Sequence, residues 1–227
     1  MAQVEINDRF LALEGCDGAG KTTLRHKLSS SLLRAGVELV EIGQHSWIDP
    51  IASRIILDVR EQRARYSSKT IEEAYRWDKK LHELKNIRPK IEEGFVLADR
   101  TILSDAVYQE ALYGIDATRS LERYVLDGYL FPGLVIYVFV DIPTALARIQ
   151  SRGKHRRHYE READLTKISK VYQKVLPTYQ VLTGGKVLYF ENKSGEMDQR
   201  FDQLIEPILG DAVSREINRS KAQHEIN

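Results

Sequence analysis

The feature that most constrains this chain is the stretch LEGCDGAGKTTLRHKL at residues 13–28, where glycines and a lysine separate an apolar segment from a helical pattern. It satisfies the pattern G-x-x-x-x-G-K-[ST], whose fixed positions here are Gly15, Gly20, Lys21 and Thr22. Residues 10–13 are apolar enough for a buried strand, and residues 21–35 predict a helix that ends at Gly36. A strand, this loop and a helix in that order predict a phosphate-binding loop.

The residue types in this loop fit the binding of a nucleoside triphosphate. Glycines allow backbone N–H groups to converge on phosphate oxygens, and the following helix adds the positive end of its dipole. We expect the Lys21 ammonium to reach the β- and γ-phosphates of ATP and the Thr22 hydroxyl to hold Mg²⁺. A glycine-rich turn with a surface lysine is the alternative. The residues expected to bind ATP are Gly15, Cys16, Asp17, Gly18, Ala19, Gly20, Lys21, Thr22 and Thr23.

Short apolar segments alternate with longer helical patterns along most of the chain. The expected strands are residues 10–13, 37–42, 95–98, 134–140 and 187–190. The expected helices are residues 21–35, 70–93, 104–113, 144–152 and 164–182, with Pro89 kinking or splitting the second of these. This alternation predicts an α/β fold with a central five-stranded parallel sheet and helices on both faces.

A second group of polar residues follows the third expected strand. Asp99 and Arg100 stand where that strand ends, and the ends of parallel strands meet at the ligand-binding edge of such a sheet. Asp99 is therefore expected to face the phosphate loop, where it would hold Mg²⁺ with Thr22 or accept a proton. Arg100 offers a planar fork for a second phosphate group. A helix-capping aspartate with a surface ion pair is the alternative.

A third feature is the basic stretch ARIQSRGKHRRHYERE, which follows the fourth strand and its helix. We expect residues 152–162 to form a small basic lid that closes over the transferring phosphates, with Arg156 or Arg157 stabilising their charge. A solvated charged face and an RNA-binding patch are the alternatives. Tyr159 is the only aromatic residue in the stretch, which argues against binding of single-stranded nucleic acid.

Composition excludes several classes of protein. Lys and Arg number 34 and Asp and Glu 33, so a net charge of +1 gives no general attraction for nucleic acid or anionic lipid. The single Cys16, the polar start and the short apolar run at 134–140 lead us to expect a cytoplasmic protein without membrane spans. We expect one kinase domain over residues 1–210 and a polar C-terminal tail over residues 211–227.

Four segments in this order resemble the thymidylate kinase family of P-loop nucleotide kinases. They are FLALEGCDGAGKTT, YRWDKKLHELKNIRPKIEEG, DRTILSDAVYQ and FVDIPTALARIQSRG, and the resemblance extends over about residues 9–209. It implies ATP- and Mg²⁺-dependent phosphoryl transfer to a small-molecule nucleotide acceptor by a homodimer, without nucleic acid or membrane partners.

The resemblance also implies roles for residues on the acceptor side. Asp17 matches the carboxylate that approaches the acceptor sugar's 3′-hydroxyl, and Arg100 matches the residue that grips its phosphate. Tyr75 matches the aromatic that stacks on the base, although a core position is an equal alternative for this ring. Tyr108 matches the ring that disfavours a 2′-hydroxyl. The residues that match the base-edge region are Lys79, Ser104, Asp105 and Gln109. Gly18 stands where some members of the family have an arginine in the loop. Members that lack this arginine bring basic residues in from the lid, and the basic stretch of this chain fits that second arrangement.

The departures from the family pattern all lie on the acceptor side. After the second strand the chain reads EIGQHSWIDP, which lacks the family's Arg-(Glu)-Pro-Gly turn and its arginine. Lys79 replaces an arginine, Asp105 replaces a neutral side chain, and Thr101 replaces an aromatic. We therefore expect phosphorylation of a pyrimidine deoxynucleoside monophosphate, dTMP before others. A different or modified nucleotide, a nucleoside, or a nucleotide-binding regulator without kinase activity are the alternatives.

Overall fold

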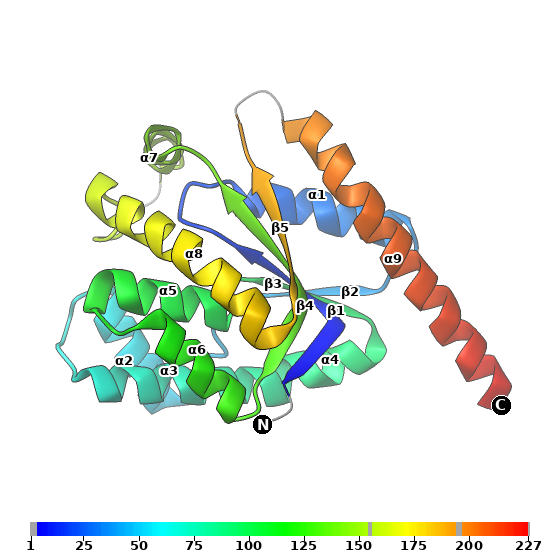
Figure 1. Ribbon diagram of the computed structural model, residues 1–227, viewed down its shortest axis with the longest axis horizontal. Coiled ribbons are helices and arrows are strands. Elements are labelled where there is room, and N and C mark those ends of the chain that lie inside the picture. Colours follow the sequence, from blue (N-terminus) through cyan, green and yellow to red (C-terminus); the bar gives the residue numbers. More distant parts are fainter. Residues whose placement is uncertain (1–3, 154–155, 194–196, 227) are drawn as a thin grey trace.

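The computed structural model describes residues 4–153, 156–193 and 197–226, and their core is a parallel sheet (Figure 1). Its five strands lie in the order β2-β3-β1-β4-β5, and every pair is parallel. The strands are β1 (Glu5–Glu14), β2 (Leu39–Ile42), β3 (Phe95–Asp99), β4 (Leu130–Phe139) and β5 (Lys186–Glu191). The predicted α/β class with a five-stranded parallel sheet is confirmed.

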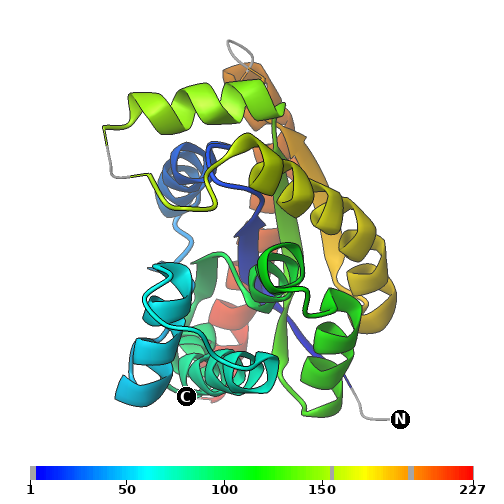
Figure 2. The ribbon, with the colours of Figure 1, turned by 90° about the vertical axis from the view of Figure 1, so that its left-hand side faces the viewer.

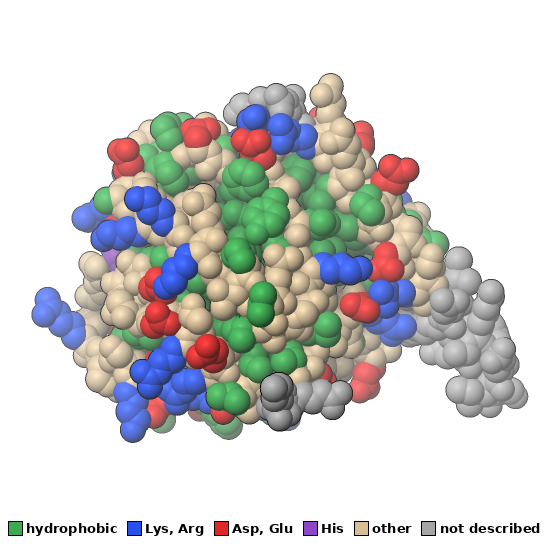
Figure 3. All heavy atoms as spheres, viewed as in Figure 1, with side chains coloured by type: hydrophobic (Ala, Val, Ile, Leu, Met, Phe, Trp, Pro, Cys, Tyr) green, Lys and Arg blue, Asp and Glu red, His purple; other side chains and the backbone are tan. Residues whose placement is uncertain are grey.

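Helices cover both faces of this sheet, as Figures 1 and 2 show. They are α1 (Lys21–Arg34), α2 (Pro50–Arg60), α3 (Ser68–His82), the π-helical turn η1 (Glu83–Ile87), α4 (Arg88–Glu93), α5 (Ile102–Tyr113), α6 (Ala117–Leu126), α7 (Ile142–Ser151), α8 (Glu162–Thr183) and α9 (Met197–Ile226). In the described part of the chain, no helix is long and apolar enough to cross a membrane. Acidic and basic side chains are interspersed over the face drawn in Figure 3.

The helix expected over residues 70–93 is three consecutive elements, α3, η1 and α4. Pro89 lies in the first turn of α4, where its missing N–H costs nothing, and the π-helical turn directly precedes α4. Helices α2 and α6 and the part of α9 before residue 211 were not predicted, although the caps of α2 and α6 are visible in the sequence. The Asp49 carboxylate accepts a hydrogen bond from Ala52 N at 2.7 Å, and Asp116 caps α6 through Arg119 N at 2.8 Å.

The C-terminal helix α9 continues through residue 210, where the kinase domain was expected to end. Ala212 is buried in the main core with Ile208 and Leu204, so packing extends past the expected boundary. Within this helix, Arg215 Nε lies 3.0 Å from Asp211 Oδ2, one turn away. The division at residue 210 remains a prediction.

Candidate active site

The loop expected to bind phosphate lies where β1 ends and α1 begins, in the position that the sequence predicted. Gly20 is the N-cap of α1 with a φ of 93°. Gly15 has a φ of 138°, and a Cβ atom there would lie 2.1 Å from the Val138 carbonyl oxygen. A Cβ on Gly18 would lie 2.3 Å from the carbonyl oxygen of Ala145 at the start of α7. The loop is therefore packed between the ends of two elements where side chains do not fit.

Lys21 is buried in this loop and folds back over it. Its Nζ donates to the carbonyl oxygens of Gly15 at 3.1 Å and Cys16 at 2.9 Å. Burial lowers the pKa of Lys21. Because both hydrogen-bond partners are neutral peptide oxygens, an anion entering the loop would find a cation whose charge these partners do not cancel.

A salt bridge joins the phosphate loop to the end of β3. Arg100 Nη2 lies 2.7 Å from Asp17 Oδ1, and both side chains line a cleft of about 830 Å³ at this edge of the sheet. Burial would raise the pKa of Asp17, but the charges of Arg100, Lys21 and Arg157 hold it well below its usual range. Asp17 is therefore an ionised acceptor of hydrogen bonds at neutral pH.

Arg100 is held in an uncommon conformation by several contacts. Its φ is 77°, a left-handed value that costs a residue with a Cβ about 1–3 kcal/mol. Its Nη1 donates to Ser104 Oγ at 3.1 Å and to the Tyr172 hydroxyl at 3.3 Å, and its guanidinium lies 4.8 Å from the Tyr108 ring centroid. These contacts place the expected residues Ser104 and Tyr108 behind Arg100.

Glu14 organises this region, and sequence reasoning missed it. Its carboxylate is fully buried and accepts hydrogen bonds from Thr101 N and Thr101 Oγ1, both at 2.7 Å, from the Tyr172 hydroxyl at 2.9 Å, and from Ser104 Oγ. The start of α5 and the partners of Arg100 are thereby fixed to β1. The available signal was a charged residue at the end of an otherwise apolar strand.

Thr22 and Asp99 both line the cleft, as expected for a metal site. Asp99 is also paired with Arg25, whose Nη1 lies 3.4 Å from Asp99 Oδ2 and whose Nε lies 3.0 Å from Glu41 Oε2. Within the described ranges, no group of three or more His, Cys, Asp or Glu residues could hold a metal ion. A hydroxyl and a carboxylate are nevertheless the hard oxygen donors that suit Mg²⁺, which usually keeps waters and substrate phosphates as its other ligands.

The basic segment between α7 and α8 lies beside the phosphate loop (Figure 2). Arg157 lines the cleft with its Nη1 at 3.8 Å from Asp17 Oδ2, and the buried Glu160 accepts a hydrogen bond from Arg157 N at 2.8 Å. Arg156 is instead bonded to the Glu160 carbonyl and is not among the described residues that line the cleft. Lys154 and His155 lie outside the described residues.

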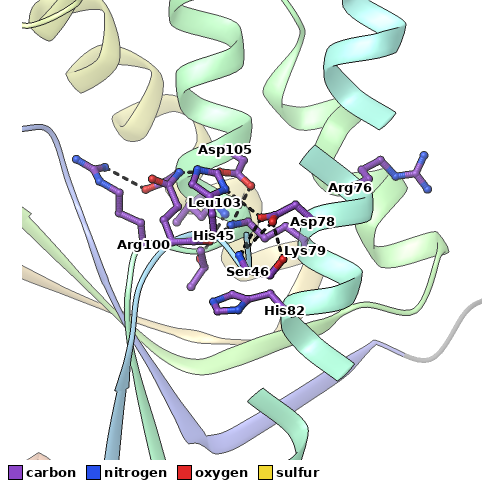
Figure 4. Close-up of polar contacts among 12 residues, drawn as sticks. His45, Ser46, Arg76, Asp78, Lys79, His82, Arg100, Leu103 and Asp105 are labelled. Atoms are coloured by element: carbon purple, nitrogen blue, oxygen red, sulfur yellow. Dashed lines mark hydrogen bonds and ion pairs between the residues drawn. The ribbon is translucent and has the colours of Figure 1, made fainter. Parts of the chain in front are cut away.

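On the acceptor side, the loop after β2 is fastened to α3 through Asp78 (Figure 4). This buried carboxylate accepts hydrogen bonds from Ser46 N at 3.1 Å, Ser46 Oγ at 2.6 Å and Trp47 N at 3.2 Å, and lies 3.0 Å from His45 Nδ1. Burial lowers the pKa of His45 to about 3, so the ring is neutral at pH 7. Since Asp78 is ionised, His45 donates from Nδ1, and no described residue bonds its Nε2.

The expected base-edge residues are joined to the same loop. Lys79 Nζ lies 3.2 Å from Asp105 Oδ2 and also donates to the Gln44 carbonyl, while Gln44 Nε2 donates to Asp105 Oδ1 at 2.7 Å. Burial raises the pKa of Asp105 to about 6. Tyr75 is buried in a cluster between α2 and α3, with its ring centroid 5.5 Å from that of His45.

The cleft lining therefore differs from the expected acceptor set. The expected acceptor-side residues that are absent from the lining in the described part are Tyr75, Lys79, Ser104, Asp105, Tyr108 and Gln109. The described residues that line this end are Gly43, Gln44, His45, Trp47 and Arg60. Sequence reasoning noted His45 and Trp47 but missed Arg60, which carries no motif and lies at the end of the unpredicted helix α2.

Comparison with known proteins gives one family. The family model described as thymidylate kinase matches residues 13–186. A thymidylate kinase of Geobacillus sp. (strain WCH70) is 35% identical over 157 residues, covering 66% of this chain and 72% of that protein. One from Geobacillus thermodenitrificans is 27% identical over 212 residues, or 90% and 91% of the two chains, and one from Leptospira borgpetersenii is 27% identical over 184 residues, or 78% and 85%. The matched region contains the phosphate loop, the Asp99–Arg100 pair and the basic segment, and the chain belongs to the thymidylate kinase family.

Proposed function

We propose that this protein is an ATP- and Mg²⁺-dependent kinase that transfers the γ-phosphoryl group of ATP to dTMP, giving dTDP and ADP. The observation that carries the proposal is the 2.7 Å pair of Asp17 and Arg100, which joins the ATP loop to the end of β3. A protein that only bound a triphosphate would need neither a carboxylate inside its loop nor an arginine facing it. A kinase that holds a second phosphorylated substrate beside ATP needs both.

The reaction joins an oxygen of the acceptor's 5′-phosphate to the γ-phosphorus as the bond between that phosphorus and ADP breaks. Lys21 and the backbone N–H groups of the loop bind the donor phosphates, and Arg100 binds the acceptor phosphate. Thr22 and Asp99 would hold Mg²⁺, which when bound supplies neutralisation of charge on the β- and γ-phosphate oxygens. Little covalent chemistry falls to the protein, so positioning and charge stabilisation account for catalysis.

Arg157 and Arg156 supply the lid cations in this proposal. Arg157 lies on the cleft next to Asp17, which supports a direct contact with the transferring phosphoryl group. Arg156 bonds to the backbone of Glu160 and so orders the segment in its present position. The ionised Asp17 is suited to accept a hydrogen bond from the acceptor sugar's 3′-hydroxyl, because its second oxygen has no short bond among the described residues.

A kinase of this fold with a different acceptor is the second candidate. It is favoured by the burial of Tyr75, Lys79 and Asp105 behind the loop after β2, which makes the acceptor end unlike the one the family resemblance implied. We also propose that this protein is a cytoplasmic homodimer and that it binds neither nucleic acid nor membrane. The near-zero net charge supports the absence of polyanion partners.

The test is ADP release with Mg²⁺ over a panel of dTMP, dUMP, dCMP, dGMP, UMP, CMP, thymidine and deoxycytidine. The proposal predicts the largest kcat/KM with dTMP and a loss of turnover when Mg²⁺ is chelated. Preference for another member of the panel would select the second candidate. Tight ATP binding without turnover of any acceptor would instead indicate a regulator.

A further inference from the structure

Among the described residues that line the acceptor end of the cleft, Arg60 is the cation whose side chain has no hydrogen-bond or ion-pair partner. Lys79, which the family resemblance assigns to the base, is 4% exposed and bonded to both Asp105 and the Gln44 carbonyl. Moving its ammonium to a ligand would leave Asp105 buried without its cation, which is strongly unfavourable. Lys79 therefore maintains the loop after β2 and is not available to the base.

Arg60 is in the opposite situation. Its side chain is partly buried and lines the cleft, and among the described residues no hydrogen bond or ion pair engages its guanidinium. The other arginines of the lining have partners there: Arg100 is paired with Asp17, Arg152 with Glu160, Arg148 donates to the Asn192 carbonyl, and Arg157 donates to the Tyr159 hydroxyl. An arginine on the cleft wall whose guanidinium has no acceptor in the described part of the chain is suited to a ligand that supplies acceptors.

The position of Arg60 is fixed by its helix. Asp49 caps the start of α2, Pro50 occupies its first turn, and Ile56 and Val59 pack in the cluster that includes Tyr75. Arg60 is the last residue of α2, where the helix dipole favours a cation. The fold therefore holds this guanidinium at the cleft wall and not on a mobile loop.

The residue before Arg60 packs on the acceptor side of the cleft: Val59 lies in the cluster with Tyr75, and its carbonyl oxygen accepts a hydrogen bond from the Tyr113 hydroxyl at 3.3 Å. Burial raises the pKa of Tyr113 to about 12, and the charge of Arg60 opposes that rise, as it opposes the rises at Tyr75 and Tyr159. The cations that act on Asp17, at the phosphate end, are Arg100, Lys21 and Arg157. Arg60 therefore lies beside the aromatic cluster of α2 and α3 and lines the cleft together with His45 and Trp47.

We propose that Arg60 recognises the acceptor's base by donating hydrogen bonds from its guanidinium to an exocyclic carbonyl oxygen of that base. A guanidinium presents several N–H groups in one plane and suits a base edge better than an ammonium does. Trp47, at 44% exposure, lines the same cleft and offers an aromatic ring on which a base can stack. The inference rests on the proposed function, in which the acceptor is a nucleoside monophosphate.

The experiment compares Arg60→Gln, Arg60→Lys and the control Arg63→Gln in steady-state kinetics and in calorimetric titration of two fragments. Thymidine carries the base without the phosphate, and 2-deoxyribose 5-phosphate carries the phosphate without the base. Arg60→Gln should raise the KM for dTMP and the Kd for thymidine ~10-fold or more. The Kd for 2-deoxyribose 5-phosphate and the KM for ATP should stay within about twofold, and Arg60→Lys should lie between wild type and Arg60→Gln.

Arg63 is exposed and lines a separate groove, so Arg63→Gln should match wild type, and circular dichroism should show all variants folded. Unchanged thymidine binding in Arg60→Gln would overturn the inference, as would an equal loss for both fragments, which would make Arg60 a phosphate ligand. Wild-type protein that bound thymidine through Arg60 but made no dTDP would contradict the proposed function while leaving the Arg60 assignment in place.

Discussion

The two ends of the cleft are built in different ways. At the end where we propose that ATP binds, the expected binding groups are consecutive residues of one loop, and Lys21 bonds to carbonyls five and six residues before it. At the acceptor end, the contacts join segments far apart in the chain, such as Gln44 with Asp105 and His45 with Asp78. The first end is therefore legible as a motif, whereas the second depends on how β2, α3 and α5 pack.

The two ends also differ in what they leave open. The Lys21 ammonium has neutral partners, whereas the Asp105 carboxylate and the Lys79 ammonium already neutralise one another. The uncompensated charge of Lys21 favours the binding of an anion in the loop. The network of Lys79 and Asp105 has its charges balanced internally and is therefore rigid. We infer that ATP binding needs little rearrangement of these polar contacts, and that acceptor choice is set by which groups the network presents at the cleft.

The largest effect is expected from removing the Lys21 ammonium, which should abolish catalysis while leaving binding at the acceptor end intact. Lys21→Ala should reduce kcat by about 10³-fold or more, because no other cation reaches the same phosphates from inside the loop. The binding of thymidine, measured by calorimetry, should remain within about twofold of wild type. Lys27→Ala, which removes a partly exposed partner of Asp198 on the same helix, is the control and should retain activity. Loss of thymidine binding in Lys21→Ala would mean that the two ends are not independent.

Arg100 lies between the ends, and its removal should affect the acceptor more than ATP. Arg100→Ala should lower kcat/KM for dTMP by about 10²–10³-fold and change the Kd for ATP by much less. The variant also leaves Asp17 without its closest cation, so Asp17→Asn should partly restore the stability of Arg100→Ala in a double variant. Normal turnover of dTMP by Arg100→Ala would contradict the proposal that Arg100 binds the acceptor phosphate.

Asp78 tests whether the acceptor end depends on the fastening of its loop. Asp78→Ala leaves Ser46 N, Trp47 N and His45 Nδ1 without their acceptor, and the free energy of unfolding should fall by about 3 kcal/mol in urea titration. The KM for dTMP should rise in the same variant, with the KM for ATP near wild type. Glu73→Ala, on the exposed side of the same helix, should cost under about 0.5 kcal/mol.

A smaller effect is expected from pH. Burial lowers the pKa of His45 to about 3 in the folded protein, below its value of 6.5 in the unfolded chain. Between these values the unfolded chain binds the extra proton, so this contribution to stability is lost as pH falls from 6.5 towards 3. Asp105, with a pKa raised to about 6, acts in the opposite direction, because the folded state binds its proton more readily.

The two contributions are separated by comparing wild type with His45→Gln. On lowering the pH from 7 to 5, the free energy of unfolding of wild type should fall by about 1–2 kcal/mol relative to that of His45→Gln. Urea titrations at the two pH values measure the difference. A pH dependence identical in the two proteins would show that His45 is not held neutral by burial.

The parts of the molecule that were predictable from sequence are those with local signals. Each such signal depends on a few neighbouring residues: the Gly15–Thr22 pattern, the apolar strands, and Gly36, which follows the end of α1. Helix α2 was not predicted, although it too has local signals, the capping residue Asp49 and Pro50 in its first turn.

The remaining parts depend on tertiary contacts that no local pattern reports. Glu14 is a ligand of the Arg100 network because β1, α5 and α8 bring it to Thr101 and Tyr172. The burial of Tyr75 and Lys79 follows from the loop after β2 folding against α3, which a one-dimensional match to the family could not indicate. The position of Arg60 on the cleft wall was likewise not predictable from a local pattern, since the packing of α2 brings it there.

The measurement that tests the central claim most directly is ³¹P NMR of wild-type protein with ATP, dTMP and Mg²⁺, run beside Lys21→Ala. We predict that the dTMP signal is replaced by the two phosphorus signals of dTDP, with ADP formed in equal amount and no inorganic phosphate. Lys21→Ala should leave the spectrum unchanged over the same time. Appearance of ADP with inorganic phosphate and intact dTMP, or no reaction in wild type, would contradict the account.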